Sequence, residues 1–120
     1  MNPSPQRRLH ERFHTSGTVT LTFREGWFGR KIVSGDLVDV SLEGLQARMP
    51  AMVPERRRVK IMLALGAAGG EAAIYQFRGR VMWSKAGEGA GQYLSGVRMQ
   101  FDFPRERTTW RDIIYEALRA

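Results

Sequence analysis

Apolar and polar residues alternate in several short stretches, and this alternation constrains the fold more than any other feature of the sequence. In residues 18–24, Val19, Leu21 and Phe23 are separated by threonines. Successive side chains of an extended strand point to opposite faces, so the stretch predicts a β-strand with one apolar and one polar face. We therefore expect this strand to be half-buried.

Further stretches have the composition of strands, and residues that favour turns separate them. Small residues cluster at 66–71, glycines recur in 87–91, and Pro50 and Pro54 interrupt regular structure. Many short strands with turns between them predict a mainly β fold, a small six-stranded antiparallel barrel over residues 17–101. The expected strands are residues 18–24, 32–40, 45–49, 59–65, 73–83 and 93–101.

Beyond Pro104 the apolar residues change from a period of two to the spacing of a helix. The pair Thr109 and Asp112 resembles a capping box and predicts a helix start nearby. We expect a C-terminal helix within residues 105–119 that packs its apolar stripe on the barrel. The stripe consists of Trp110, Ile113, Ile114, Ala117 and Leu118.

The length and composition fit a single domain over residues 1–120. A chain of 120 residues can bury a substantial core but is too short for two ordinary domains. Because the chain lacks cysteine, disulfide frameworks, thiolate nucleophiles and cysteine-based zinc sites are excluded. No apolar stretch has the length of a membrane span, and the N-terminus lacks the apolar core of a signal peptide. We expect a cytoplasmic domain, either independent or part of a larger membrane-bound protein.

The strand expected at residues 32–40 runs into a polar turn that suits a planar, polar ligand. Asp39 and Ser41 share one face of this segment. A carboxylate can accept from an amide-type N–H edge, and a hydroxyl can add a further hydrogen bond. Gly44 can take a positive φ or let a ligand approach closely. The net charge of +7 favours an anionic partner, either a nucleotide, a nucleic acid or a membrane surface.

Arginines near the N-terminus offer the donors that such a ligand needs. Arg7, Arg8 and Arg12 each carry a planar, permanently charged guanidinium. Its rigid fork of donors matches phosphate oxygens or the O6/N7 edge of guanine.

The two segments together resemble the two-part signature of PilZ domains, the bacterial receptors for cyclic di-GMP. The signature consists here of R-x-x-x-R at residues 8–12, followed by D-x-S-x-x-G at residues 39–44. Residues 79–83 and 93–101 are similar to the closing strands of the family. The resemblance therefore covers most of the chain, from residue 7 to residue 101.

The resemblance implies a non-enzymatic receptor for cyclic di-GMP that needs no metal or other cofactor. Arg8 and Arg12 would bind guanine Hoogsteen edges and phosphates, and Asp39 would accept from a guanine N–H edge. Ser41 and Gly44 would line the pocket. Ligand binding would change the N-terminal conformation or the contacts with a downstream protein or parent domain, neither of which the sequence identifies.

Arg7 and Trp83 carry finer expectations. In PilZ relatives, an arginine directly before the arginine motif goes with two intercalated ligands, which implies two cyclic di-GMP molecules per chain. A third guanidinium would offset part of the repulsion among their phosphates, although Arg7 could equally be a solvated terminal residue. Trp83 could stack on a guanine or pack in the core. Residues 1–12 have little apolar anchoring, so we expect them to be flexible without ligand.

Other interpretations of the sequence compete with this one. His10 and His14 fall in an H-E-x-x-H zinc pattern, but no long amphipathic helix surrounds them, so we expect no metal site. A small basic barrel could instead bind single-stranded nucleic acid, which we do not expect, and a PilZ-like scaffold could bind a protein without any nucleotide.

The sequence leaves the roles of two surface segments open. The arginines at residues 56–58 form either a patch for an anionic partner or a solvated loop face, the simpler interpretation. Trp27 and Phe28 lie in the first hairpin connection, and we expect them to cover one end of the barrel.

Overall fold

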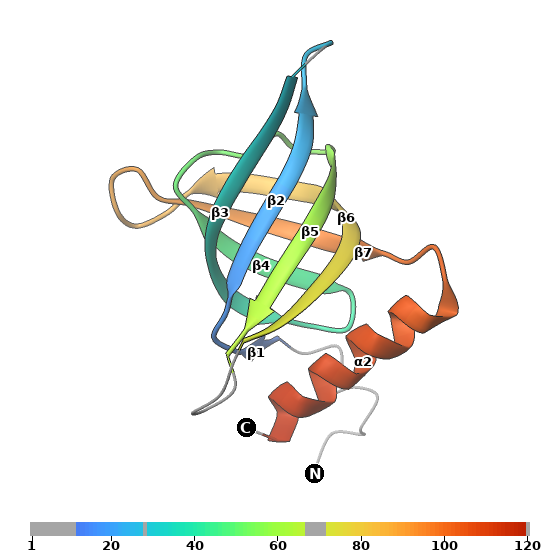
Figure 1. Cartoon of the computed structure of the whole chain (residues 1–120). Coiled ribbons are helices and arrows are strands. Elements are labelled where there is room, and N and C mark those ends of the chain that lie inside the picture. The colour runs from blue at the N-terminus through green and yellow to red at the C-terminus, as the bar shows by residue number, and fades with distance from the viewer. Residues whose placement is uncertain (1–11, 28, 67–71, 120) are drawn as a thin grey trace.

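The computed structural model of the protein describes residues 12–27, 29–66 and 72–119. Seven strands and one helix lie in these ranges (Figure 1). In chain order they are β1 (Phe13–His14), β2 (Thr18–Glu25), β3 (Gly29–Val40), β4 (Gly44–Met49), β5 (Arg58–Leu65), β6 (Ala73–Ala86), β7 (Tyr93–Gln100) and α2 (Pro104–Arg119).

Six of the strands close into a barrel. Neighbours follow the order β3-β2-β5-β6-β7-β4, and β4 pairs back with β3. All of these pairings are antiparallel. The predicted mainly β fold, a six-stranded antiparallel barrel with a C-terminal helix, is confirmed. The additional strand β1 lies beside the end of β3, with Phe13 opposite Val40 and His14 opposite Asp39. It was not predicted, because two residues are too few to show a period.

The alternation in the sequence corresponds to the inside and outside of the barrel. Val19, Leu21 and Phe23 of β2 are buried, whereas the threonines between them are at least partly accessible. β6 changes phase along its length, because a register irregularity lies between Val81 and Trp83. The other strands add to the same core through Val33, Leu37, Leu45, Ala47, Val59, Ile61, Leu63, Phe77, Val97 and Met99.

The hairpin between β2 and β3 is longer than predicted. Pairing continues to Glu25 and Gly29, and Gly26 takes a positive φ of 73° in the connection. Trp27 is 92% exposed, so the prediction that it covers a barrel end is wrong. The physical reason is that the ribbon extends past its neighbours (Figure 1), which leaves no surface against which Trp27 could pack. Phe28 lies outside the described residues.

The helix α2 begins one residue before the predicted range of residues 105–119, but its first turn is not capped by the predicted pair Thr109 and Asp112. Pro104 occupies its first position, where a fixed φ and a missing N–H are tolerated. The Oε1 atom of Glu106 accepts hydrogen bonds from the backbone N–H groups of Asp102 and Phe103, at 2.9 and 3.0 Å. Thr109 lies inside the helix and donates to the carbonyl of Arg105, so its predicted capping role is wrong.

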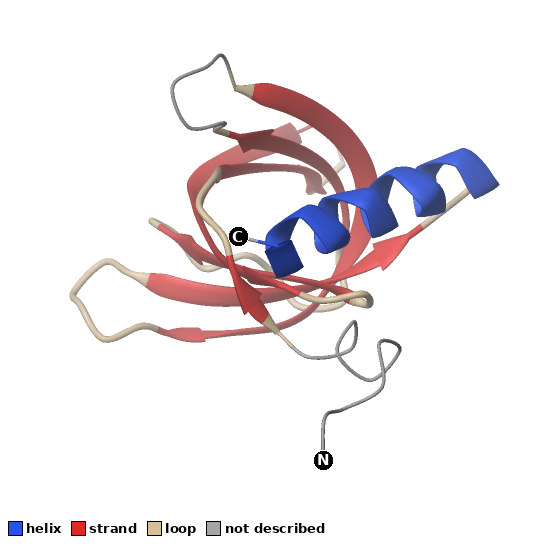
Figure 2. Cartoon of the chain, turned by 90° about the horizontal axis from the view of Figure 1, so that it is seen from below, coloured by secondary structure: helices blue, strands red, loops and turns tan. Residues whose placement is uncertain are grey.

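The helix α2 lies across one end of the barrel (Figure 2) and packs its apolar stripe against the core. Trp110 and Ile114 are fully buried and Ile113 nearly so. The Trp110 ring meets Phe77 edge to face, with 5.4 Å between ring centroids. Ala117 packs against the same core, and the side chain of Leu118 is outside the described part.

We expect Trp110→Ala to lower the free energy of unfolding by about 3–5 kcal/mol, because it removes a fully buried indole. Tyr115→Ala is the control, since Tyr115 lies on the exposed side of the same helix. Chemical denaturation of both variants measures the difference. Similar losses in the two variants would mean that the docked face of α2 contributes no more than helix formation itself.

Candidate functional site

A tight turn joins β3 to β4 and carries half of the predicted site. The N–H of Ser41 donates to the carbonyl of Gly44 at 2.8 Å, and the N–H of Gly44 donates back to Ser41 at 3.2 Å. Trp110 stabilises the turn from α2, because its Nε1–H lies 3.1 Å from the carbonyl oxygens of both Ser41 and Leu42. The position of the turn therefore depends on how the helix docks.

Gly44 has a packing role that the sequence did not predict. Among the described glycines only Gly26 and Gly91 have a positive φ, so Gly44 does not use the first of the two possibilities that the sequence left open for it. A Cβ at this position would instead overlap the carbonyl oxygen of Val97 on the neighbouring strand β7. The close approach of two backbones explains the glycine.

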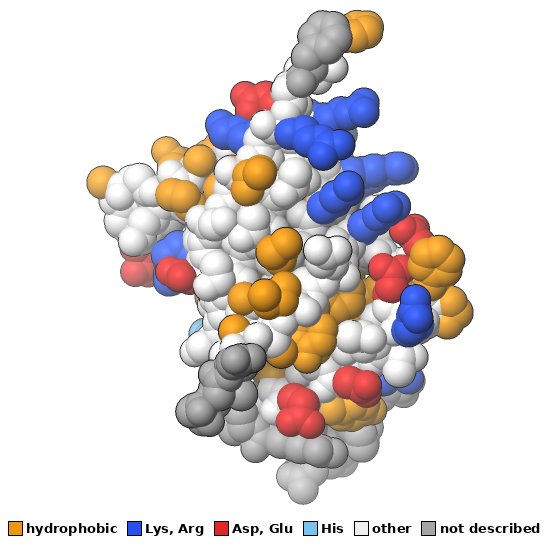
Figure 3. Space-filling model, viewed as in Figure 1, with side chains coloured by type: hydrophobic (Ala, Val, Ile, Leu, Met, Phe, Trp, Pro, Cys, Tyr) orange, Lys and Arg blue, Asp and Glu red, His pale blue; other side chains and the backbone are white. Residues whose placement is uncertain are grey.

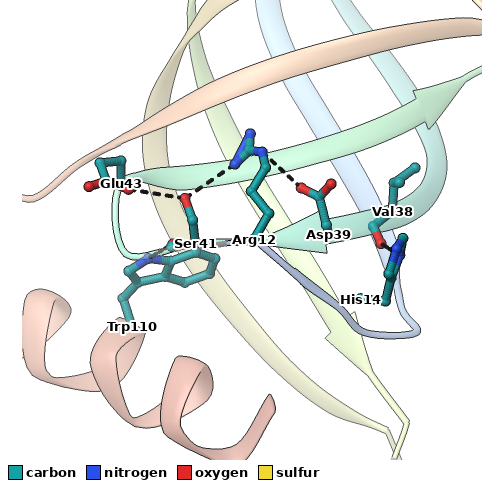
Figure 4. A network of polar contacts seen from close by, with 7 residues as sticks. All are labelled: Arg12, His14, Val38, Asp39, Ser41, Glu43 and Trp110. Carbon is teal, nitrogen blue, oxygen red and sulfur yellow. Dashed lines mark hydrogen bonds and ion pairs between the residues drawn. The ribbon is translucent and has the colours of Figure 1, made fainter. Parts of the chain in front are cut away.

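Arg12 connects the N-terminal motif to this turn (Figure 4). Its Nε lies 3.3 Å from Oδ1 of Asp39, and its Nη1 donates to Oγ of Ser41 at 3.2 Å. The hydroxyl of Ser41 in turn donates to Oε2 of Glu43 at 3.2 Å. The structure thus brings Arg12, Asp39 and Ser41 together across 27 residues of sequence, as the two-part motif predicted.

Asp39 has unused capacity to accept hydrogen bonds. The contact with Arg12 is an ion pair without hydrogen-bond geometry, so the buried Oδ1 has no hydrogen-bond donor among the described residues. Burial raises the pKa of Asp39 above its ordinary value, while the nearby charges of Arg12 and His14 lower it by less. A buried acceptor without a donor lowers stability, and a ligand N–H could satisfy it.

A shallow pocket of about 390 Å³ opens beside these residues. Arg12 and Gly44 line it together with Trp83, Met82 and Arg98, and Glu43, Gly96 and Val97 complete the wall. Trp83 is half-buried and absent from the buried core, because its ring lies over Gly96, where a Cβ would overlap it. Nζ of Lys85 lies 5.2 Å from the centre of the Trp83 ring. Trp83 therefore faces the pocket, which leaves its role in ligand binding as a prediction.

Arg98 belongs to this pocket and was not among the predicted site residues. It is the cross-strand partner of Gly44 between β4 and β7. Its outward position was visible in the alternation of residues 93–101. The pairing of β4 with β7, which places it beside the motif, joins distant segments that no local pattern connects.

The structure describes only some of the remaining predicted positions. Arg7, Arg8 and the segment expected to be flexible, except Arg12, lie outside the described residues. His14 lies in a strand, and its Nδ1 is 3.1 Å from the carbonyl of Val38. No group of three His, Cys, Asp or Glu residues within the described ranges could hold a metal ion.

Comparison with known proteins agrees with this arrangement. The sequence matches the family model of the PilZ domain over residues 6–116. The chain belongs to the PilZ domain family. A solved structure with similar architecture is the PilZ domain with c-di-GMP of YcgR from Escherichia coli, at 15% sequence identity and a TM-score of 0.68. The match covers 91% of this chain and 89% of that one. No curated protein sequence matches the chain. In the described part of this PilZ domain, no helix is long and apolar enough to cross a membrane.

The raised pKa of Asp39 predicts how its replacement changes stability with pH. Burial disfavours the ionised form of Asp39, so its pKa is higher in the folded state than in the unfolded state. The stability that protonated Asp39 contributes is therefore complete at pH values below its unfolded-state pKa, and it is lost as pH rises through its folded-state pKa. We expect Asp39→Asn to raise the melting temperature of the unliganded domain near neutral pH, and the gain to shrink as the solution is acidified.

Thermal unfolding of both proteins across this pH range measures the effect. Asp36→Asn is the matched control, because Asp36 is an exposed carboxylate on the same strand. A gain for Asp39→Asn that stays constant with pH would show that ionisation of Asp39 is not its cause.

Proposed function

We propose that this PilZ domain is a receptor for cyclic di-GMP. The observation that carries the proposal is the meeting of Arg12 with the buried Asp39 carboxylate, one oxygen of which lacks a hydrogen-bond donor among the described residues. Arg12 belongs to the R-x-x-x-R motif and Asp39 to the D-x-S-x-x-G motif. Arg12 also lines the pocket. The similar domain of YcgR was solved with c-di-GMP, which supports the same ligand here.

Each group of the site has a matching group on this ligand. The N1–H and N2–H donors of guanine match a carboxylate acceptor such as Asp39. The forks of Arg8 and Arg12 would bind the O6/N7 edge or a phosphate oxygen, and Arg98 would add a further positive charge at the pocket. The exposed side of the Trp83 ring offers a surface on which a base could stack.

Ser41 contributes through Arg12 in this proposal. Ser41 is only 2% exposed, and its hydroxyl already forms hydrogen bonds with both Arg12 and Glu43. It would hold the guanidinium in the orientation that the ligand needs, and Gly44 would keep the turn close to β7. This role refines the predicted hydrogen bond from Ser41 to the ligand.

The receptor acts by binding and performs no chemical step in this proposal. Arg7, Arg8 and Arg12 precede or border β1, so a ligand that engages them would change the arrangement of the N-terminal segment relative to the barrel. A downstream protein, or another domain of a longer parent protein, would detect that change.

We expect Arg12→Ala to weaken cyclic di-GMP binding by about tenfold to a hundredfold, because charge-assisted hydrogen bonds contribute about 1.5–3 kcal/mol. Isothermal titration calorimetry measures the change. The matched control is Arg105→Ala, which removes an exposed arginine of α2. Equal affinities of Arg12→Ala and the wild type would remove Arg12 from the binding site.

The same titration separates the proposed ligand from its alternatives. Cyclic di-GMP should bind more tightly than GMP, because only the cyclic dinucleotide presents two guanines and two phosphates to the two motifs. A single-stranded oligonucleotide that bound more tightly would favour the nucleic-acid alternative. A chain that bound neither nucleotide would favour the protein scaffold.

The stoichiometry depends on Arg7 in this proposal. Two stacked ligands bring four phosphate charges together, and a third guanidinium beside Arg8 would offset part of their repulsion. We expect two molecules of cyclic di-GMP per chain and a fall to one in Arg7→Leu, with an affinity that decreases as salt is added. A ratio of one in both proteins would show that Arg7 does not support a ligand dimer.

A further inference from the structure

A second concave surface lies on the barrel wall beside the long hairpin of β2 and β3. Its volume is about 620 Å³. Seven of its lining residues are arginine or lysine, and its one acidic residue, Asp102, pairs with Arg78 at 3.1 Å. Figure 3 shows Lys and Arg side chains gathered along this side of the barrel. We call this surface the basic face.

The strand register explains why the positive charges gather there. Lys60 of β5 lies opposite Thr22 of β2 and Arg78 of β6, so one outward row crosses three strands. Arg24 and Arg30 are partners in the next outward row, nearer the hairpin tip. Like charges on adjacent strands repel each other, which lowers the stability of the unliganded surface. An anionic partner would remove that repulsion.

The loop before β5 adds to the same surface. Arg57 donates a hydrogen bond from Nη1 to the backbone carbonyl of Arg24, so the loop is held against β2. Arg56 and Arg58 also line the face. The arginine run at residues 56–58 therefore belongs to a shaped surface, although the sequence favoured a solvated loop.

The hairpin places an exposed aromatic residue at the edge of the basic face. Trp27 is 92% exposed and follows Arg24 by three residues. Near the tip, the acidic Glu25 is balanced by Lys31 at 3.7 Å. Tryptophan favours the boundary between lipid headgroups and acyl chains, because the apolar part of its ring can lie among the acyl chains while its N–H remains solvated.

The dimensions of the hairpin fit a lipid surface. Arg24 is the next-to-last residue of β2 and Trp27 lies in the turn beyond it, so their backbones are at most about 10 Å apart, the reach of three extended residues. The headgroup layer of one leaflet is about 5–8 Å thick, and the indole side chain adds to this reach. When Arg24 and Arg30 lie at the level of the phosphates, Trp27 can reach the acyl boundary. We propose that the basic face and Trp27 form a docking surface for membranes that contain anionic phospholipid.

The arrangement of the aromatic residues favours this partner over nucleic acid. Proteins that bind single strands stack successive bases on aromatic side chains that lie along a basic groove. The aromatic residue of this cavity, Phe23, is buried in the core, and Trp27 lies beyond the groove at the hairpin tip. Such an arrangement suits a planar headgroup layer that a single aromatic residue penetrates.

Co-sedimentation with vesicles tests the proposal on the full chain. We expect binding to vesicles of phosphatidylglycerol and phosphatidylcholine, and none to phosphatidylcholine alone. Each cation near an anionic membrane raises partitioning by about fivefold, so Arg24→Gln/Arg30→Gln/Lys60→Gln should lower the partition coefficient by at least about tenfold. Trp27→Ala should also lower it, and the blue shift of tryptophan fluorescence on binding should be lost in Trp27→Phe.

Two matched controls make the test specific. Arg48→Gln/Arg105→Gln/Arg111→Gln removes the same charge from exposed positions outside the basic face, and Phe103→Ala removes an exposed aromatic residue elsewhere. Both control variants should retain vesicle binding. Arg12→Ala should also retain it, although this variant is expected to lose affinity for cyclic di-GMP. A failure of the membrane proposal can therefore be told apart from a failure of the proposed cyclic di-GMP binding. Equal losses in the two triple variants would overturn it. So would the absence of binding to anionic vesicles, or tighter binding of single-stranded oligonucleotide through Arg24, Arg30 and Lys60.

Discussion

The hydrogen bonds from the indole of Trp110 to the turn at residues 41–44 hold the candidate site against the core. They link the C-terminal helix, the closure between β3 and β4, and the motif that carries Asp39 and Ser41. The indole is fully buried, so its N–H must find an acceptor inside the protein. The carbonyl groups of a tight turn provide it. The geometry of the candidate site is therefore inseparable from the packing of the core.

The site combines burial and charge in a way that opposes its own stability. Asp39 is held in a buried position with an incompletely satisfied oxygen, beside an arginine that is still partly exposed. Such an arrangement is costly in the absence of ligand and can be relieved by a donor from outside. Strain of this kind is common at binding sites, because the groups that recognise a ligand cannot be fully satisfied without it.

The basic face and the pocket beside Gly44 are connected through the barrel wall. Arg58, Arg80 and Arg98 are successive cross-strand partners on β5, β6 and β7. Arg58 lines the basic face, and Arg98 lines the pocket beside Gly44. Nε of Arg80, between them, is buried without a hydrogen-bond acceptor among the described residues. A single strand, β6, therefore separates the positive charge of Arg58 on the basic face from that of Arg98 at the pocket.

Alternation and helical spacing are local properties of the chain, so the sequence by itself determined the barrel and the C-terminal helix. The pairing of the two distant motifs was predicted by their resemblance to the PilZ signature. The expected helix range, residues 105–119, agrees with α2 to within one residue, but the capping role expected of Thr109 was wrong, because Pro104 and Glu106 satisfy the first turn. Only the tertiary structure placed Arg98 at the pocket, exposed Trp27, and showed that Gly44 accommodates Val97. These features depend on strand register and on how far a hairpin extends, which arise from contacts between segments distant in sequence.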